Sequence, residues 1–305
     1  MIHNEFAGHF TLTVHNADGT VKETREFQNL ITDNGLNLMA GSPPGFGWTL
    51  GNCQVGTAST PPVATNSTLG AFRAVAGLFN GQVSSGYNAT DKYHWRRWVY
   101  RFNQGAAAGN LTEIGIGWSG EAQGNLFSHA LIVDTSGAPT TLVITANEFL
   151  TVTYELRNYP KSGDVVTTAT IDGVERTITV RPAQIERAGD WGSNIPTVNA
   201  YTGGQSTTYD GIAWCTGKIA AETTLPANEM GMSQNTRTWS TYVPNSFRRE
   251  CVSVAGINDA NGTLNSLTFN TGIGKWQVGF DPPIVKNNTM ELRVTMAVSW
   301  GRYTP

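Results

Sequence analysis

The stretch GHFTLTVHNADGTVKETREF, residues 8–27, decides how the first part of this chain folds. Its apolar residues Phe10, Leu12 and Val14 alternate with threonine, Asp18-Gly19 supplies a turn signal, and a second alternating run follows. This pattern predicts a β-hairpin. The stretch TTATIDGVERTITVR, residues 167–181, repeats the order around Asp172-Gly173. A second hairpin is therefore expected there.

Two short helices are predicted between the strands. Asp33 is expected to cap the first helix, which carries Leu36 and Met39 and ends before Gly41, because Pro43-Pro44 cannot continue it. A second short helix is expected over residues 67–75.

The segment 93–160 changes to a period of two, which is typical of strands. In FLTVTYELR, residues 149–157, the predicted inward set is Leu150, Val152, Tyr154 and Leu156. In YHWRRWVYRF, residues 93–102, one face carries Trp98, Tyr100 and Phe102, and the other carries Trp95, Arg97, Val99 and Arg101. Three or four strands of one antiparallel sheet are expected here.

The second half repeats the order of the first. RRWVYRFNQGAAAGNLTEI at 96–114 is matched by RRECVSVAGINDANGTLNSL at 248–267, and ITANEFLTVTYELRNYP at 144–160 by IVKNNTMELRVTMAVSWGRY at 284–303. Chance similarity between β-rich segments is the alternative. We predict an all-β chain of two tandem antiparallel β-sandwich modules that arose by internal duplication, with short helices. The modules are expected over residues 1–160 and 161–305, divided at the polar Lys-Ser-Gly-Asp.

Composition narrows the possible partners. Charged residues make up 14% of the 305 positions and the formal net charge is -3, against about 25% charged residues in a typical domain. The only basic clusters are the pairs Arg96-Arg97 and Arg248-Arg249, so a nucleic acid partner is not expected. No apolar run is long enough for a membrane span and the N-terminus lacks signal-peptide features. Folding in the cytoplasm without membrane insertion is the expectation.

Neither a metal nor a cofactor is expected. Cys53, Cys215 and Cys251 have no CxxC spacing and are interpreted as buried free thiols. The five histidines form no HxH, HExxH or HxxxH pair, and the glycine-rich GIGW and TGIGKW lack the pattern of a phosphate loop.

No catalytic residues are predicted, and the chain is expected not to be an enzyme. Five carboxylates were considered as a glycosidase pair: Glu113, Glu121, Asp134, Glu148 and Glu155. Solvated strand faces explain Glu148 and Glu155, and no acid and base can be singled out. A tail-associated glycan hydrolase is kept as an alternative.

Aromatic and arginine residues suggest two kinds of contact. The Trp and Arg face of residues 95–101, together with the second Arg pair, predicts an interface formed by Trp95, Arg97, Arg101, Arg248 and Arg249. Packing of the Arg stems over Trp within the monomer and a sugar platform are the alternatives. The loops 42–66 and 187–217 hold the residues predicted to bind glycan: Trp48, Trp191, Tyr201, Tyr209 and Trp214.

Residues 27–160 contain the phrases FQNLITDNGLNLM, VGTASTPPVATNSTL, NLTEIGIGWS, LFSHALIVD and GAPTTLVITANEFLTVTYELR. These phrases resemble tail proteins of tailed bacteriophages, a group of tail-fibre, baseplate and virion structural components, and the resemblance covers mainly residues 27–160. The resemblance brings no catalytic motif. It implies a virion protein of the tail, assembled in the host cytoplasm. The chain lacks the collagen-like, coiled-coil or β-helical repeats of long fibre shafts, so a compact ring, adaptor or short receptor-binding piece is expected.

Three functions follow from this resemblance. The first is a tail tip, baseplate or fibre-attachment component that assembles with itself and with other virion proteins. A trimer is favoured, with a hexamer as the alternative, because duplicated modules would match six-fold to three-fold symmetry. The second is a receptor-binding protein that attaches to host surface glycan. The third is a capsid decoration protein.

Overall fold

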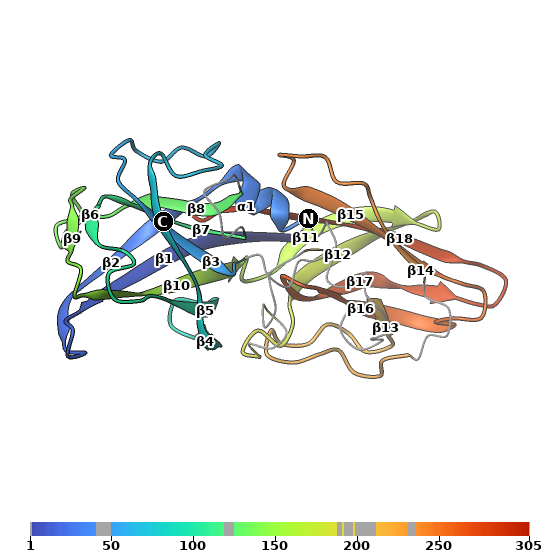
Figure 1. Ribbon diagram of the computed structural model, residues 1–305. Helices are drawn as coiled ribbons and strands as arrows, with labels where there is room; N and C mark the ends of the chain where they lie inside the picture. Colours follow the sequence, from blue (N-terminus) through green and yellow to red (C-terminus); the bar gives the residue numbers. More distant parts are fainter. Residues whose placement is uncertain are drawn as a thin grey trace. The chain divides into compact units, whose positions relative to one another are not determined.

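A computed structural model describes residues 2–40, 50–118, 125–187, 191, 198, 212–230 and 236–304. The chain divides into two compact units (Figure 1). We call Phe6–Gly86, Trp95–Arg157 and Arg302–Pro305 the barrel unit, and Met1–Glu5, Tyr87–His94 and Asn158–Gly301 the open unit. Each unit is built almost entirely from β-strands, which confirms the predicted all-β class.

Eight strands form the barrel unit. They pair in the order β10-β5-β4-β3-β7-β8-β2-β1, and β1 also pairs with β10, so the sheet closes on itself. Their bounds are β1 Ile2–His15, β2 Val21–Ile31, β3 Asn52–Gly56, β4 Phe72–Asn88, β5 Tyr93–Phe102, β7 Glu113–Gly117, β8 Leu126–Leu131 and β10 Phe149–Pro160. The short strands β6 (Gly109–Leu111) and β9 (Leu142–Ile144) pair with each other. The first unit is therefore a closed barrel and not the predicted β-sandwich. Closure leaves no free strand edges, which a sandwich would keep.

Alternation along the strands places the core as predicted. The side chains Phe10, Leu12 and Val14 of β1 are buried, as are Trp98, Tyr100 and Phe102 of β5 and Leu150, Val152, Tyr154 and Leu156 of β10. Ring contacts join strands that are distant in sequence, because Tyr154 lies against Phe10 and Phe127. Burying these large side chains stabilises the barrel by about 1.5–3 kcal/mol each.

One helix occurs among the described residues, α1 over Asp33–Leu38. It was predicted, but its N-cap is Thr32, whose Oγ1 accepts the Gly35 N–H at 3.0 Å. The helix predicted over residues 67–75 is wrong. There Leu69 is buried in a loop and β4 begins at Phe72, because pairing with β3 and β5 outweighs the local helix propensity of a short segment.

The open unit contains a five-stranded sheet of order β11-β12-β17-β16-β13 and the three paired strands β18-β15-β14. The bounds are β11 Val165–Ile171, β12 Val174–Pro182, β13 Ile212–Cys215, β14 Thr236–Trp239, β15 Arg248–Ala255, β16 Gly262–Thr271, β17 Gly274–Lys286 and β18 Leu292–Arg302. The predicted second hairpin is confirmed: β11 and β12 pair in continuous register around Asp172-Gly173.

Aromatic rings form the core of the open unit. Trp191 packs edge-on against Trp276, Trp276 lies near Phe269, and Phe269 contacts Trp239 of β14. His94 stacks on Trp191, with ring centroids 5.1 Å apart. It is 3% exposed, and burial lowers its pKa from 6.5 to about 3. His94 is therefore a neutral member of this core at physiological pH.

The two halves of the chain share one strand order. The run β1-β2-β8-β7-β3 of the first half corresponds to β11-β12-β17-β16-β13 of the second, and β4-β5-β10 corresponds to β14-β15-β18. Two pairings of the first half, β3 with β4 and β10 with β1, have no counterpart between the corresponding strands of the described second half. The compact units interleave along the chain, whereas the predicted division at residues 160/161 follows the sequence repeat.

Candidate functional site: the loop 57–71 and its buried carboxylate

A compact loop over residues 57–71 leaves the barrel between β3 and β4. Its ends meet, because the Thr57 N–H donates to the Ala71 oxygen at 2.9 Å. A segment of this length whose ends are close and whose own side chains pack beneath it is an Ω-loop. Leu69 supplies the buried apolar contact.

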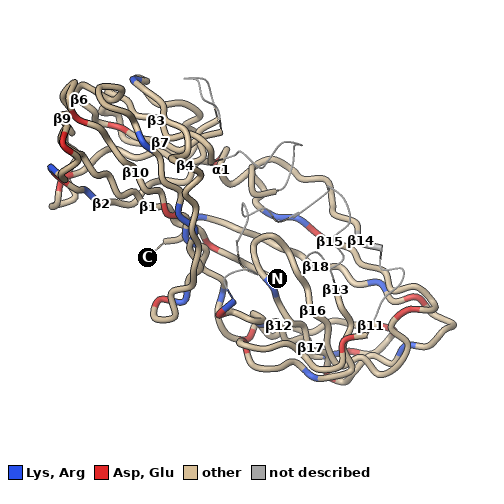
Figure 2. Tube along the Cα trace, turned by 60° about the horizontal axis from the view of Figure 1, so that its bottom comes forward, with Lys and Arg blue, Asp and Glu red and all other residues tan. Residues whose placement is uncertain are grey.

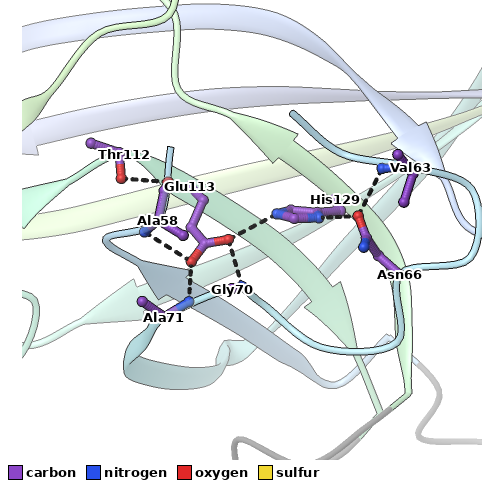
Figure 3. Close-up of polar contacts among 8 residues, drawn as sticks. All are labelled: Ala58, Val63, Asn66, Gly70, Ala71, Thr112, Glu113 and His129. Atoms are coloured by element: carbon purple, nitrogen blue, oxygen red, sulfur yellow. Dashed lines mark hydrogen bonds and ion pairs between the residues drawn. The ribbon is translucent and has the colours of Figure 1, made fainter. Parts of the chain in front are cut away.

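Glu113, the first residue of β7, lies beneath this loop and is fully buried. Its carboxylate accepts the backbone N–H groups of Ala58 at 3.2 Å, Gly70 at 2.9 Å and Ala71 at 2.7 Å (Figure 3). One side chain thus joins both ends of the loop to the barrel. Burial alone would raise the pKa of Glu113, but hydrogen bonds from His129 and from these three N–H groups leave it below its ordinary value.

His129 of β8 connects Glu113 to the middle of the loop. Its Nε2 lies 3.0 Å from Glu113 Oε2, and its Nδ1 lies 3.0 Å from Asn66 Oδ1 (Figure 3). That Oδ1 also accepts the Val63 N–H at 2.8 Å, which identifies it as the oxygen of the amide. An imidazole facing two acceptors satisfies both only when each nitrogen carries a proton. We call Glu113, His129 and Asn66 the latch.

The latch is suited to holding the loop and unsuited to catalysis. A histidine that acts as a general base needs one nitrogen free for a nucleophile or substrate, but both nitrogens of His129 face latch oxygens. Solvent access is also missing, because Glu113 and His129 are 0% and 3% exposed. Removing the partner of a buried hydrogen-bonded group costs about 1–3 kcal/mol, and more when the group is charged.

The outer side of the loop is presented to solvent. Val63 is 53% exposed, and its neighbours Pro61 and Thr65 are also exposed. A loop fixed from below loses little conformational entropy when a partner covers its outer side. We therefore regard the loop 57–71 as a candidate contact surface.

The second half holds a corresponding loop after β13. The Thr216 N–H donates to the Asn228 oxygen at 3.2 Å and closes residues 216–228, as Thr57 closes the first loop. Ser266 lies opposite Cys215, the last residue of β13, as Glu113 lies opposite Gly56, the last residue of β3.

Two neutral side chains hold this second loop. Ser266 donates to the Gly217 oxygen at 2.6 Å. Gln277 occupies the place in the β16–β17 register that His129 occupies between β7 and β8, and it accepts the Ala220 N–H at 2.6 Å and donates to Ala221 at 3.1 Å. Both side chains are fully buried. The two halves therefore anchor corresponding loops from corresponding positions with different chemistry.

The interface residues predicted on β5 lie on the outer side of the barrel. The Arg97 guanidinium stacks on Trp95 at 4.3 Å and pairs with Glu155 at 2.5 Å. Arg101 lies over the rings of Phe149 and Phe79. These contacts within one chain correspond to the alternative in which Arg stems cover aromatic rings.

The second predicted Arg pair divides between surface and interior. Arg248 is exposed and pairs with Glu250 at 2.6 Å. Arg249 is 8% exposed and donates two hydrogen bonds to the Ser240 oxygen, at 3.1 and 2.6 Å. Arg248 is therefore accessible to a partner, whereas Arg249 stabilises the fold of its own chain.

Of the five residues predicted to bind glycan, Trp48, Tyr201 and Tyr209 lie outside the described residues. Trp191 and Trp214 are 1% and 0% exposed. Trp191 packs against Trp276 and Trp214 stacks near Phe280. As placed, neither ring offers a face to a sugar.

The four described carboxylates that were considered for catalysis have separate partners. Glu155 pairs with Arg97 and Arg157, and Glu148 pairs with Lys22. Both residues are buried, so the prediction that they lie on solvated strand faces is wrong, because ion pairs compensate their burial. Asp134 accepts hydrogen bonds from its own turn, and Glu121 lies outside the described residues. Glu113 was considered only as a catalytic group. The signal for its structural role is a charged residue at the start of the otherwise apolar strand EIGIG, Glu113–Gly117.

Charged residues are scattered along the tube (Figure 2). Among the described residues, no group of three or more His, Cys, Asp or Glu side chains is placed to hold a metal ion. The three cysteines are free and buried, as predicted. Within the same ranges, the structure has no helix with the length and apolar character needed to cross a membrane.

Comparison with protein-family models, with curated proteins and with solved structures finds no match.

Proposed function

We propose that this chain is a non-enzymatic structural component of a bacteriophage tail, at the tail tip, the baseplate or a fibre attachment. It assembles with copies of itself and with neighbouring virion proteins, and it reaches the virion after folding in the host cytoplasm. The tail context comes from the resemblance of residues 27–160 to tail proteins. The structural role is supported by the paired architecture of the chain.

The observation that carries the structural role is the repeated, anchored loop. Corresponding strands β3 and β13 are followed by loops that Glu113 and Ser266 fasten from corresponding positions. Gly109 and Gly262, which precede these residues in both halves, have φ angles of 138° and 140°, where residues with a side chain are strained. These correspondences support an internal duplication.

A duplicated chain presents two similar contact loops per copy. Three copies present six similar loops, which suits a position between six-fold and three-fold parts of a tail. We therefore favour a trimer, with a hexamer as the other closed arrangement.

The polar groups of the candidate site also favour structure over catalysis. Glu113 is the most buried carboxylate among the described residues, and its oxygens accept hydrogen bonds from backbone N–H groups and face His129. A catalytic carboxylate must instead reach a substrate.

The proposal is tested on purified phage particles. Mass spectrometry of particles from an infected culture should find the chain in a fixed ratio to other tail proteins, and tails separated from heads should retain it. Recovery with heads alone would assign it to capsid decoration. Its absence from particles would contradict a virion role, and release of new reducing ends from host polysaccharide by the purified chain would contradict a non-enzymatic one.

A further inference from the structure

We propose that strand β11 is a docking edge for a second copy of this chain, and that the two copies pair antiparallel, β11 against β11, across a two-fold axis. This inference rests on the open unit alone and does not require the tail assignment. A two-fold contact does not occur within a cyclic trimer, but it can join two trimers into the hexamer named above.

β11 is a strand edge without a partner in the described part of the chain. It pairs with β12 on one side and is the terminal strand of its sheet. The corresponding strand of the first half, β1, has neighbours on both sides, β2 and β10. A sheet edge carries a row of N–H and C=O groups directed outward, which pair readily with another strand.

In the described part of the chain, β11 has no intramolecular partner that corresponds to the partner β10 of β1. By the shared strand order, that strand would be β18, the counterpart of β10. One side of β18 is taken by β15. Within the open unit, the first residues of β1 take the other side, where His3 Nδ1 lies 2.8 Å from Ser299 Oγ and that hydroxyl donates to the Ile2 oxygen.

The sequence of β11 lacks the features that protect natural edges. Val-Val-Thr-Thr-Ala-Thr-Ile contains no charge and no proline, and its register with β12 runs from Val165 to Ile171 without a bulge. Val166 is 60% exposed, and residues 167–170 are exposed as well. Native proteins usually place lysine, proline or a bulge on an edge that must stay single.

The hydrogen-bonding pattern between β11 and β12 determines which backbone groups of β11 are free to bond to another strand. Asp172 and Gly173 have φ angles of 53° and 71°, as in the two-residue turn that makes the flanking pair Ile171 and Val174 hydrogen-bonded. Because bonded and non-bonded pairs alternate along an antiparallel ladder, residues 167 and 169 also bond to β12. The N–H and C=O groups of Val166, Thr168 and Thr170 are then directed to the free edge.

A second β11 fits this edge better than a charged strand would. With Thr168 on the two-fold axis, Thr168 faces its own copy and Val166 faces Thr170, so all three outward residues find partners. Every cross-strand pair is uncharged, and no like charges oppose one another within the ladder. Asp164, just before the strand, is already paired with Arg181 at 2.5 Å.

Disulfide trapping tests this register. In the proposed dimer, the two Thr168 residues form a hydrogen-bonded pair with Cα atoms about 5.5 Å apart, within the range that a disulfide spans. Thr177 is exposed and lies opposite Thr168 on β12, but the two Thr177 residues would be about 14 Å apart, three strand spacings. Thr168→Cys should give a disulfide-linked dimer under mild oxidation, and the matched control Thr177→Cys should not.

A second measurement uses the unmodified chain. Sedimentation velocity over a concentration series should detect self-association that Thr168→Lys weakens about tenfold or more, because two like charges then face one another. Thr177→Lys should leave the association unchanged. A chain that stays monomeric at high micromolar concentration and gives no Thr168→Cys dimer would overturn the inference.

Equal cross-linking of both cysteine variants would also overturn it. So would an oligomer that Thr168→Lys does not affect, although that result would leave the proposed tail function standing. Conversely, a β11 dimer that is absent from phage particles would remove the tail function and leave the docking edge.

Discussion

The barrel unit and the open unit differ in closure although their strands follow the same order. β1 has 14 residues and β4 has 17, and each pairs on both sides. Their counterparts β11 and β14 have 7 and 4 residues, and among the described residues each is a terminal strand. Closing a sheet requires strands long enough to pair with both neighbours despite their stagger. The comparison indicates that the same strand order can give a closed barrel or separate open sheets, depending on the length of the strands.

The anchored loops differ in chemistry rather than position. The loop 57–71 is held by a buried carboxylate and imidazole, and the loop 216–228 by the hydroxyl of Ser266 and the amide of Gln277. Charged groups bind backbone donors more strongly than neutral ones, but they cost more when a partner is lost. The first loop should therefore be the more sensitive of the two to substitution.

The largest expected effect is the difference in stability lost when the anchor of each loop, Glu113 or Ser266, is removed. Glu113→Ala leaves three backbone N–H groups and the buried His129 without their acceptor, and should lower the free energy of unfolding by about 3–5 kcal/mol. Ser266→Ala removes one neutral hydrogen bond and should cost about 1 kcal/mol. Urea denaturation of both variants measures the difference. Equal losses would mean that the charge of the latch contributes nothing.

Lowering the pH should weaken the anchor of the first loop, Glu113, and leave that of the second, Ser266, unchanged. Because the pKa of Glu113 is lowered in the folded chain, its contribution is complete above the unfolded value of about 4.3 and is lost as the pH falls through the lower folded value. Ser266 has no such dependence. A Glu113→Gln variant should therefore lose less stability than the wild type as the pH is lowered below about 4.3.

A second effect concerns His94 in the core of the open unit. Its pKa is about 3 in the folded chain and about 6.5 when unfolded, so its contribution is complete above pH 6.5 and declines as the pH falls toward 3. The decline is at most about 1.4 kcal/mol per pH unit. His94→Phe keeps a ring against Tyr87 and Trp191 and should remove this part of the pH dependence. Parallel pH profiles of wild type and variant would contradict neutral burial.

The smallest expected effect compares the second arginine of each matched pair. Arg249 is buried and bonded to Ser240, so Arg249→Ala should cost about 1–3 kcal/mol. Arg97 retains 47% side-chain exposure, and Arg97→Ala should cost about 1 kcal/mol or less. Thermal unfolding of the two variants ranks them. A larger loss for Arg97 would reverse the comparison.

Local patterns made much of the fold predictable. Alternation located β1, β5 and β10 with their buried faces, and Asp-Gly pairs located both hairpins. These features depend on neighbours in sequence. Thr32 was missed as the cap of α1 because Asp33, one residue later, is an equally good cap by residue type.

Closure and the latch were not predictable in this way. Whether β1 pairs with β10 depends on strands 130 or more residues apart, about which local periodicity says nothing. The segment 67–75 was predicted to be helical because its propensity favours a helix, but pairing of β4 with β3 and β5 overrode it. The role of Glu113 depends on the loop above it, and its residue type alone is typical of a solvated strand face.

Amide hydrogen exchange measured residue by residue tests the contrast between closed and open halves most directly. In dilute protein, the amides of Val166, Thr168 and Thr170 should exchange rapidly, because they face the free edge, while those of residues 167 and 169 and of β1 over residues 8–14 are protected. Raising the concentration should then protect the three edge amides. Protection of all β11 amides in dilute monomer, equal to that of β1, would contradict the account.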